Sequence, residues 1–272
     1  MFDMINQDIK EIIIILIVIL IIYHFYLTYN VCSGSDSIDI YEFQSENYKV
    51  GDKTILIIGG THGNEPAGYH AIKTFMKNLN LNKIKLNSCK LILIPQVNYC
   101  ALKIGLRFIP EIGDLNRKYP TSIDGKSNNN IIKQIQNKIS EADFVLDFHE
   151  GWGFNRLNGD SMGSTITPTN TELSFNIARD LFSNINKNLK DHKRFRILTT
   201  NSDLVKSDPD LYSLETDIHG SLRYYCNIIN KDYILIETTG QNNIQELSVR
   251  INQNLFIINH ILKSHLKKKI VN

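Results

Sequence analysis

The chain has 272 residues, enough for one full-sized hydrophobic core and too few for two. Its hydrophobic share of 42% and charged share of 21% are ordinary for a globular protein, so the composition excludes a disordered chain. The formal net charge of +2 argues against a nucleic-acid-binding protein, and four cysteines without Cys-x-x-Cys spacing argue against a cysteine zinc site.

The first predicted element is an apolar segment near the N-terminus. Ile12–Tyr23 is an unbroken apolar run, and the apolar character continues to about residue 28. Such a segment would be roughly 25 Å long as a helix, at the short end of a bilayer span. We predict that residues 1–30 form a hydrophobic helix and a single-pass membrane anchor, with residues 12–28 in the membrane. A secretory signal cleaved near Ser33 is the alternative, and a buried core helix is a third interpretation.

The rest of the chain has the pattern of an α/β domain. Residues 31–45 are rich in Ser and Asp and predict a linker, which leaves residues 46–272 as the main domain. Apolar runs predict strands at Thr54–Ile58, Lys90–Val97, Phe144–Phe148, Arg196–Thr199 and Tyr233–Ile236. Helical spacing predicts helices at Pro66–Leu79, Ile131–Glu141, Glu172–Asn188 and Ile244–Leu266. Fully apolar strands separated by helices predict a mostly parallel or mixed central sheet flanked by helices.

Three of these strands end in ionisable residues. The first runs into a glycine-rich segment with His62 and Glu65, the third ends at His149, and the last ends at Glu237. Ligands of open α/β sheets bind at the carboxyl ends of strands, so we expect these side chains to meet. A catalytic zinc takes three histidine or carboxylate ligands and keeps one position for water. His62, Glu65 and His149 supply such a set, which leaves Glu237 as a general base. Hydrogen-bonded residues without a metal are the alternative.

Four motifs in chain order resemble those of the zinc carboxypeptidase superfamily. The first, Gly59-Gly60-Thr61-His62-Gly63-Asn64-Glu65, is similar to its succinylglutamate desuccinylase/aspartoacylase branch. The others are Asp114-Leu115-Asn116-Arg117, Asp147-Phe148-His149 and Glu237-Thr238-Thr239-Gly240. The resemblance covers about residues 50–266 and implies a zinc-carboxypeptidase-like fold. It also implies one zinc ion per chain, bound by His62, Glu65 and His149.

The resemblance implies roles for further residues. Glu237 would act first as general base and then as general acid. Asn116 and Arg117 would bind a substrate carboxylate, for which the planar guanidinium group is suited. Arg107 would polarise the scissile carbonyl and stabilise the oxyanion, although an exposed loop arginine is the alternative. We expect Glu150 to orient a ligand rather than to bind the metal.

These roles predict a zinc-dependent amide hydrolase, a deacylase that cleaves an N-acyl amino acid or a similar carboxylate-bearing amide with zinc-activated water. A zinc metallocarboxypeptidase acting on peptide C-termini is one alternative. A membrane-tethered zinc-binding module without turnover is another. The expected partners are a small-molecule or peptide substrate with a free carboxylate and a membrane, and no nucleic acid.

Overall fold

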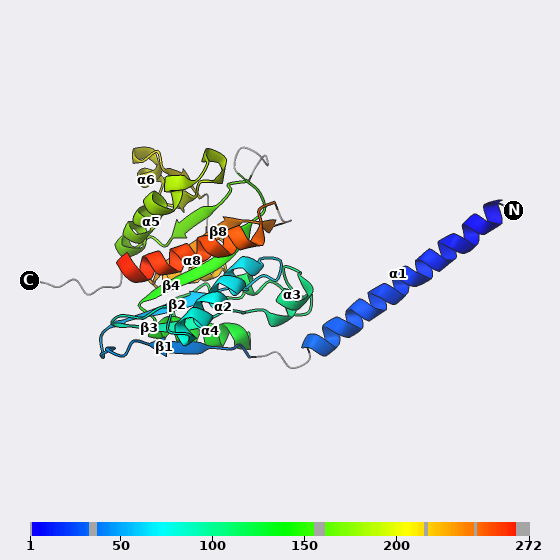
Figure 1. The fold of residues 1–272 in the computed structure, drawn as a ribbon, viewed down its shortest axis with the longest axis horizontal. Coiled ribbons are helices and arrows are strands. Elements are labelled where there is room, and N and C mark those ends of the chain that lie inside the picture. Colours follow the sequence, from blue (N-terminus) through cyan, green and yellow to red (C-terminus); the bar gives the residue numbers. More distant parts are fainter. Residues whose placement is uncertain (1, 33–36, 155–160, 215–216, 242–243, 265–272) are drawn as a thin grey trace, which may run out of the picture. The chain divides into compact units, whose positions relative to one another are not determined.

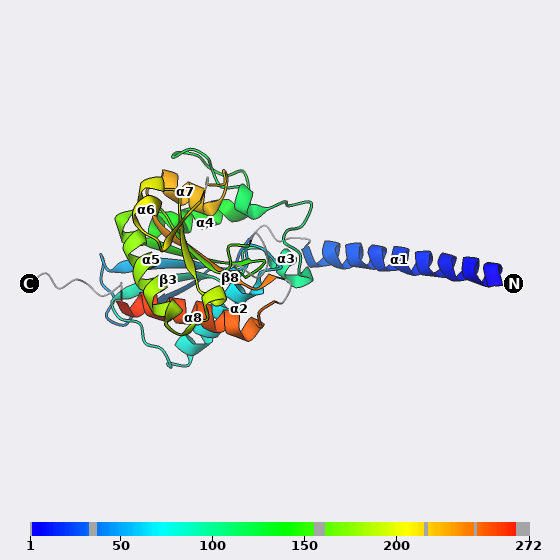
Figure 2. The ribbon, with the colours of Figure 1, turned by 90° about the horizontal axis from the view of Figure 1, so that it is seen from above.

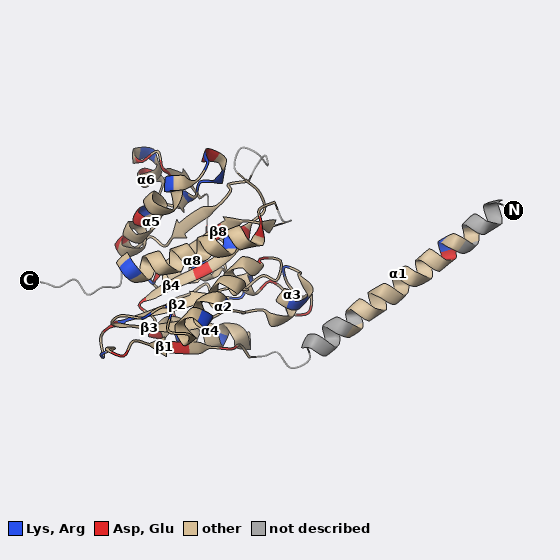
Figure 3. Ribbon diagram, in the orientation of Figure 1, with Lys and Arg blue, Asp and Glu red and all other residues tan. Residues whose placement is uncertain are grey.

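The computed structural model describes residues 2–32, 37–154, 161–214, 217–241 and 244–264. The chain divides into two units, Met1–Ser35 and Asp36–Asn272. The described part of the first unit is one helix, α1 (Phe2–Cys32). Its apolar run Ile12–Tyr23 is exposed. Among the side chains of α1 that the structure describes, the charged ones are Lys10 and Glu11, and both precede that run (Figure 3).

The prediction of a single-pass membrane anchor through residues 12–28 is wrong. Among the described residues, no helix has both the length and the apolar character needed to cross a membrane. Length is the physical reason, because the unbroken apolar run Ile12–Tyr23 rises about 18 Å as a helix while the hydrocarbon core of a bilayer is about 30 Å thick. The alternative of signal cleavage near Ser33 lies outside the described residues.

The second unit is built on one eight-stranded sheet with the order β1-β3-β2-β4-β8-β5-β6-β7 (Figure 1). Its strands are β1 (Tyr41–Gln44), β2 (Lys53–Ile58), β3 (Cys89–Ile94), β4 (Phe144–Gly151), β5 (Thr165–Pro168), β6 (Arg196–Thr199), β7 (Leu211–Ser213) and β8 (Asp232–Thr239). Neighbouring strands are parallel except that β1 is antiparallel to β3 and β5 is antiparallel to β8. The predicted mixed sheet flanked by helices is confirmed.

Helices cover both faces of the sheet because its central strands are apolar on both sides. Ile55 and Ile57 pack into one core with helices α2 (Pro66–Asn80), α5 (Glu172–Ile185) and α8 (Leu247–Ser264). Leu56 and Ile58 pack into a second core with α4 (Asn130–Glu141) and α7 (Leu222–Ile228). Figure 2 shows α2 and α8 on one side of the sheet and α4 and α7 on the other. The connections contain α3 (Tyr99–Ile104), α6 (Ser202–Ser207), η1 (Leu115–Arg117), η2 (Asn186–Asn188) and η3 (Asp191–Lys193).

The structure differs from the predicted elements where strands are short. Strand β1 lies within residues 31–45, the predicted linker, of which residues 33–36 are outside the described part. It pairs along β3 and adds an antiparallel edge to the sheet. The strands β5 and β7, of four and three residues, are also absent from the predicted elements.

Strands β2, β4 and β8 are adjacent at the centre of the sheet and run parallel. Their carboxyl ends therefore meet at one edge. Strand β4 continues to Gly151 and β8 to Thr239, so that His149 pairs in register with Glu237. This pairing brings together two of the ionisable side chains that the sequence places at strand ends.

Candidate metal and active site

Three residues from two strand ends form the centre of the site. His62 follows β2 in a tight turn, Glu65 occupies the N-cap position of α2, and His149 lies near the end of β4. The turn requires glycine at position 63, because a Cβ there would lie 1.9 Å from the backbone of Ala101. This close approach of α3 to the turn fixes the chain between the two ligand candidates of the first motif.

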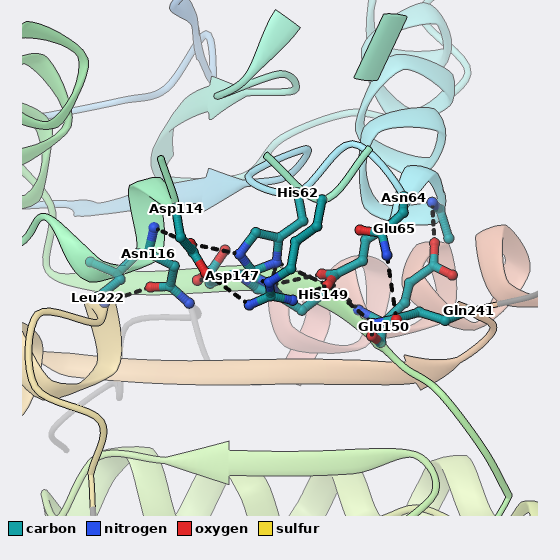
Figure 4. Close-up of polar contacts among 12 residues, drawn as sticks. His62, Asn64, Glu65, Asp114, Asn116, Asp147, His149, Glu150, Leu222 and Gln241 are labelled. Carbon is teal, nitrogen blue, oxygen red and sulfur yellow. Dashed lines mark hydrogen bonds and ion pairs between the residues drawn. The ribbon is translucent and has the colours of Figure 1, made fainter. Parts of the chain in front are cut away.

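The polar atoms of these three residues converge on one point (Figure 4). Nδ1 of His62 lies 2.9 Å from Oε1 of Glu65, and Nδ1 of His149 lies 2.8 Å from Oε2 of Glu65. The two Nδ1 atoms are 3.1 Å apart. All three side chains are buried, and their possible ligand atoms lie within 4.8 Å of one another.

Two aspartates hold the far sides of the imidazole rings. Nε2 of His62 lies 3.1 Å from Oδ1 of Asp114, and Nε2 of His149 lies 3.2 Å from Oδ2 of Asp147. Tyr233 donates its hydroxyl proton to the same Oδ2 of Asp147 over 3.0 Å. A carboxylate at Nε2 favours the tautomer that carries its proton there, and that tautomer leaves Nδ1 free as a lone-pair donor.

The charges around this centre shift the pKa values of its groups. Burial by itself raises the pKa of Glu65, but the charges and hydrogen bonds of His149 and His62 outweigh it and hold the pKa below its ordinary value. Burial lowers the pKa of His149, but Asp147 and Glu65 raise it well above its usual range. Burial raises the pKa of Glu237, and the negative charge of Glu65 adds to the effect. The site thus concentrates negative charge around two imidazoles.

This donor set fits a zinc ion. When both imidazoles are neutral and each Nε2 proton is directed to its aspartate, both Nδ1 atoms and the Glu65 carboxylate present only lone pairs to the shared point. Acceptors facing one another at these distances repel, and a cation between them removes the repulsion. Two imidazole nitrogens and one carboxylate are the ligand set of catalytic zinc sites, and aspartates behind the imidazoles are the usual outer partners of such sites.

A cavity of about 340 Å³ opens beside the three residues. Glu237, Arg107, Asn116 and Arg117 all line it, together with His62, Glu65 and His149. Its floor is the sheet face that carries alternate residues of β8, where Tyr233, Leu235 and Glu237 point the same way. The structure therefore brings every sequence-predicted site residue to one cavity.

Two of the arginines differ in their contacts. Arg107 is partly exposed and forms ion pairs with Glu65 and Asp114, each over 3.1 Å. Arg117 is exposed and donates from Nη1 to the backbone carbonyl of Asn116 over 2.7 Å. Asn116 uses its side-chain oxygen to accept from the N–H of Leu222, the first residue of α7, over 2.9 Å. Arg107 thus contacts the ligand candidates, whereas Arg117 contacts the backbone of its neighbour and lines the cavity.

Several residues around the site were not assigned roles from the sequence. Asp147 could have been found, because it precedes His149 by two positions and so shares its face of the strand. Gln241 follows the Glu237 motif directly, and its amide donates to Oε1 of Glu65 over 3.2 Å. Arg250 contacts Glu150 from helix α8, and no local pattern distinguishes it from a surface arginine.

Comparison with known proteins gives one family match. Residues 51–153 match the family model of the succinylglutamate desuccinylase/aspartoacylase catalytic domain. The N-α-acetyl-L-2,4-diaminobutyric acid deacetylase of Halomonas elongata is 31% identical over 100 residues, which cover 36% of this chain and 28% of that protein.

Two solved structures show the same fold. The tripeptide-bound cell shape determinant Csd4 of Helicobacter pylori has a TM-score of 0.65 at 19% identity and is similar over 83% of this chain and 54% of its own. A succinylglutamate desuccinylase of Silicibacter has a TM-score of 0.56 at 20% identity, over 83% of this chain and 59% of its own. The chain thus spans little more than half the length of these structures.

Proposed function

We propose that this chain is a zinc-dependent amide hydrolase. The match of residues 51–153 to the succinylglutamate desuccinylase/aspartoacylase catalytic domain and the fold shared with Csd4 support the proposal. One observation carries the proposal. Two imidazole Nδ1 atoms and one carboxylate converge within hydrogen-bond distance at the end of a cavity that Glu237 also lines. The succinylglutamate desuccinylase/aspartoacylase match favours a deacylase.

In this proposal His62, Glu65 and His149 bind the zinc ion, one per chain. A zinc ion held there would lower the pKa of a water molecule toward neutrality and would polarise an amide carbonyl. Asp114 and Asp147 hold the two imidazoles so that each Nδ1 faces the metal.

Glu237 moves the proton. It pairs in register with His149 and lines the same cavity, and it is not among the three residues grouped as possible metal ligands. Burial and the nearby Glu65 raise its pKa, so its carboxylate is a stronger base than an exposed glutamate. Glu237 takes a proton from the attacking water and passes it to the nitrogen of the leaving amine.

Arginines recognise and polarise the substrate. Arg107 donates from Nη1 to Glu65 and lines the cavity, and in this proposal it stabilises the carbonyl oxygen that develops negative charge. Arg117, with Asn116 beside it, binds the free carboxylate of the substrate through the planar guanidinium group. The substrate class is therefore an amide that carries a carboxylate, with an N-acyl amino acid as the first candidate.

A metallocarboxypeptidase is the second candidate, and the rim of the cavity favours it. Trp152, Met162 and Ile218 line the cavity and are also exposed, by 50%, 37% and 54%. Such a rim has room for more apolar surface than an acetyl group offers, as a peptide chain would provide. The similar protein Csd4 is described as a D,L-carboxypeptidase.

Mass spectrometry of reaction products tests the proposal. The zinc-loaded chain is incubated with N-acyl amino acids and with N-blocked short peptides, alongside the Glu237→Gln variant and a chelator-treated sample. We expect the wild type alone to hydrolyse a carboxylate-bearing amide. Release of the acyl group identifies a deacylase, and release of the C-terminal amino acid from peptides identifies a carboxypeptidase. Zinc binding without turnover of either class would indicate a non-catalytic zinc-binding module and contradict the proposal.

A further inference from the structure

Helix α2 begins without a cap from its own N-cap residue. Glu65 occupies that position, but its side chain makes no capping hydrogen bond. Both of its carboxylate oxygens face the imidazoles of His62 and His149. The first backbone N–H groups of a helix lack partners within the helix, so a buried start needs acceptors from elsewhere. Pro66 has no N–H group, which makes Ala67 the first donor of α2.

The acceptor for this donor comes from β4. Oε1 of Glu150 accepts a hydrogen bond of 2.6 Å from the backbone N–H of Ala67. The Glu150 side chain lies on the opposite face of β4 from His149, where it contacts Ala67 of α2 and Arg250 of α8, because successive residues of a strand face opposite sides. Its side chain is fully buried. A carboxylate at a helix N-terminus is also favoured by the helix dipole. Glu150 thus caps the helix that Glu65 leaves uncapped.

Arg250 of helix α8 holds Glu150 in this position. Nη1 of Arg250 forms an ion pair with Oε2 of Glu150, and the arginine side chain is only 2% exposed. The space around the pair admits nothing larger than glycine at position 240. A Cβ there would lie 2.0 Å from Cδ of Arg250 and 2.4 Å from Oε2 of Glu150. The pair therefore ties α8, the end of β4 and the end of β8 to the start of α2.

The main chain at Glu150 also contacts Glu65 directly. Its N–H donates to Oε2 of Glu65 over 3.2 Å. The amide of Gln241 donates to the carbonyl oxygen of Glu150 over 2.5 Å and to Oε1 of Glu65 over 3.2 Å (Figure 4). The Glu150 side chain thus fixes the backbone just after Glu65, while its main chain fixes the Glu65 carboxylate.

We infer that the Glu150–Arg250 pair is a positioning device that caps α2 in place of Glu65 and so leaves the Glu65 carboxylate available to the metal. The inference rests on the proposed function, since it takes Glu65 as a zinc ligand. If Glu150 were removed, the Glu65 carboxylate would be the nearest acceptor for the N–H groups of its own helix. Capping and metal binding would then compete for the same oxygens.

Two double variants of the full chain separate capping from charge. Glu150→Leu/Arg250→Met removes the buried pair and the acceptor for Ala67. Glu150→Gln/Arg250→Met also removes the charges but keeps an amide oxygen that can accept from Ala67. Replacing both partners of a buried ion pair leaves no unpaired buried charge, so we expect both variants to fold. The zinc dissociation constant is measured by competition with a chromophoric chelator, and the folding of the metal-free proteins is checked by circular dichroism.

We expect the leucine variant to bind zinc about 10- to 100-fold more weakly than the wild type, the usual effect of losing an outer partner of a metal site. The glutamine variant should recover most of that loss. Equal zinc affinity in wild type and both variants would overturn the inference and leave the proposed function intact. A wild type that binds no zinc would contradict the proposed function and the inference with it. If the leucine variant does not fold, Glu150→Ala/Arg250→Met takes its place, since it also lacks an acceptor for the N–H of Ala67, and a zinc affinity equal to that of the glutamine variant overturns the inference.

Discussion

Replacing Asp147 by Asn tests whether the carboxylates behind the imidazoles set the metal affinity. Asp147 is 1% exposed, and its Oδ2 atom lies 3.2 Å from Nε2 of His149. Asparagine has the same shape, so packing is preserved. If the amide group turns its nitrogen to Nε2, the imidazole must carry its proton on Nδ1, where the metal would bind. If it turns its oxygen to Nε2, the bond survives but loses the negative charge that strengthens it.

The loss of such an outer partner typically lowers metal affinity by about 10- to 100-fold. This range corresponds to about 1.4–2.7 kcal/mol in binding free energy. The matched control is Tyr233→Phe, which removes the 3.0 Å hydrogen bond to the same oxygen of Asp147 but leaves the carboxylate in place. We expect the control to change zinc affinity much less, because the contact with His149 remains.

The assay is a zinc competition titration near neutral pH, combined with thermal unfolding of the metal-free proteins. Unfolding separates a specific loss of metal binding from a general loss of stability. Zinc binding by Asp147→Asn as tight as that of the wild type would refute a role of the carboxylate in metal affinity. An equal loss of zinc affinity in Tyr233→Phe would also refute it, because that variant keeps the Asp147 carboxylate.

Three further predictions concern base, substrate and proton competition. Glu237→Gln should keep the zinc affinity of the wild type while kcat falls by about 10²- to 10⁴-fold, and loss of zinc in this variant would show that Glu237 is a ligand. Arg117→Ala should lower kcat/KM about 10²-fold on a carboxylate-bearing substrate and hardly change it on the amidated analogue, with Arg117→Lys in between; equal losses on both substrates would exclude carboxylate recognition. Asp147 and Glu65 raise the pKa of His149, so a proton competes with the metal below that pKa. Zinc affinity should therefore rise with pH up to that pKa, by about tenfold per pH unit for one displaced proton, and a flat calorimetric pH profile would contradict this.

The central part of the fold was predictable because its strands are apolar on both faces. The runs that became β2, β3, β4, β6 and β8 are short and apolar, and helical spacing identified α2, α4, α5 and α8. Position in the sheet was not predictable to the same degree. The strand β5 runs antiparallel to β8, and this direction depends on the path of the chain rather than on any local pattern.

The metal site was also largely predictable from the sequence, for a related reason. His62 follows β2, and His149 and Glu237 lie near the carboxyl ends of β4 and β8; these three strands are parallel neighbours and end at one edge. Contacts between elements that are far apart in the sequence leave no comparable pattern in the sequence. Asp114 reaches His62 from a loop 52 positions away, and Arg250 reaches Glu150 from a helix 100 positions away.

The prediction for the N-terminal segment was wrong. Its apolar run suggested a membrane span, but apolar composition alone does not show that a helix is long enough to cross a bilayer. The run Ile12–Tyr23 has the composition of a span and too little length for one. Length was therefore the more informative quantity in this case, and composition the less informative one.

The zinc content of the purified protein tests the central claim most directly. The chain is prepared without chelators, dialysed, and analysed by inductively coupled plasma mass spectrometry together with His62→Ala and His149→Ala. We expect about one zinc ion per wild-type chain, because two imidazoles and one carboxylate form a complete catalytic ligand set. Each histidine variant should lose the metal while its circular dichroism spectrum stays that of the folded protein. Wild-type protein without zinc, or full zinc occupancy in both folded variants, would contradict the account.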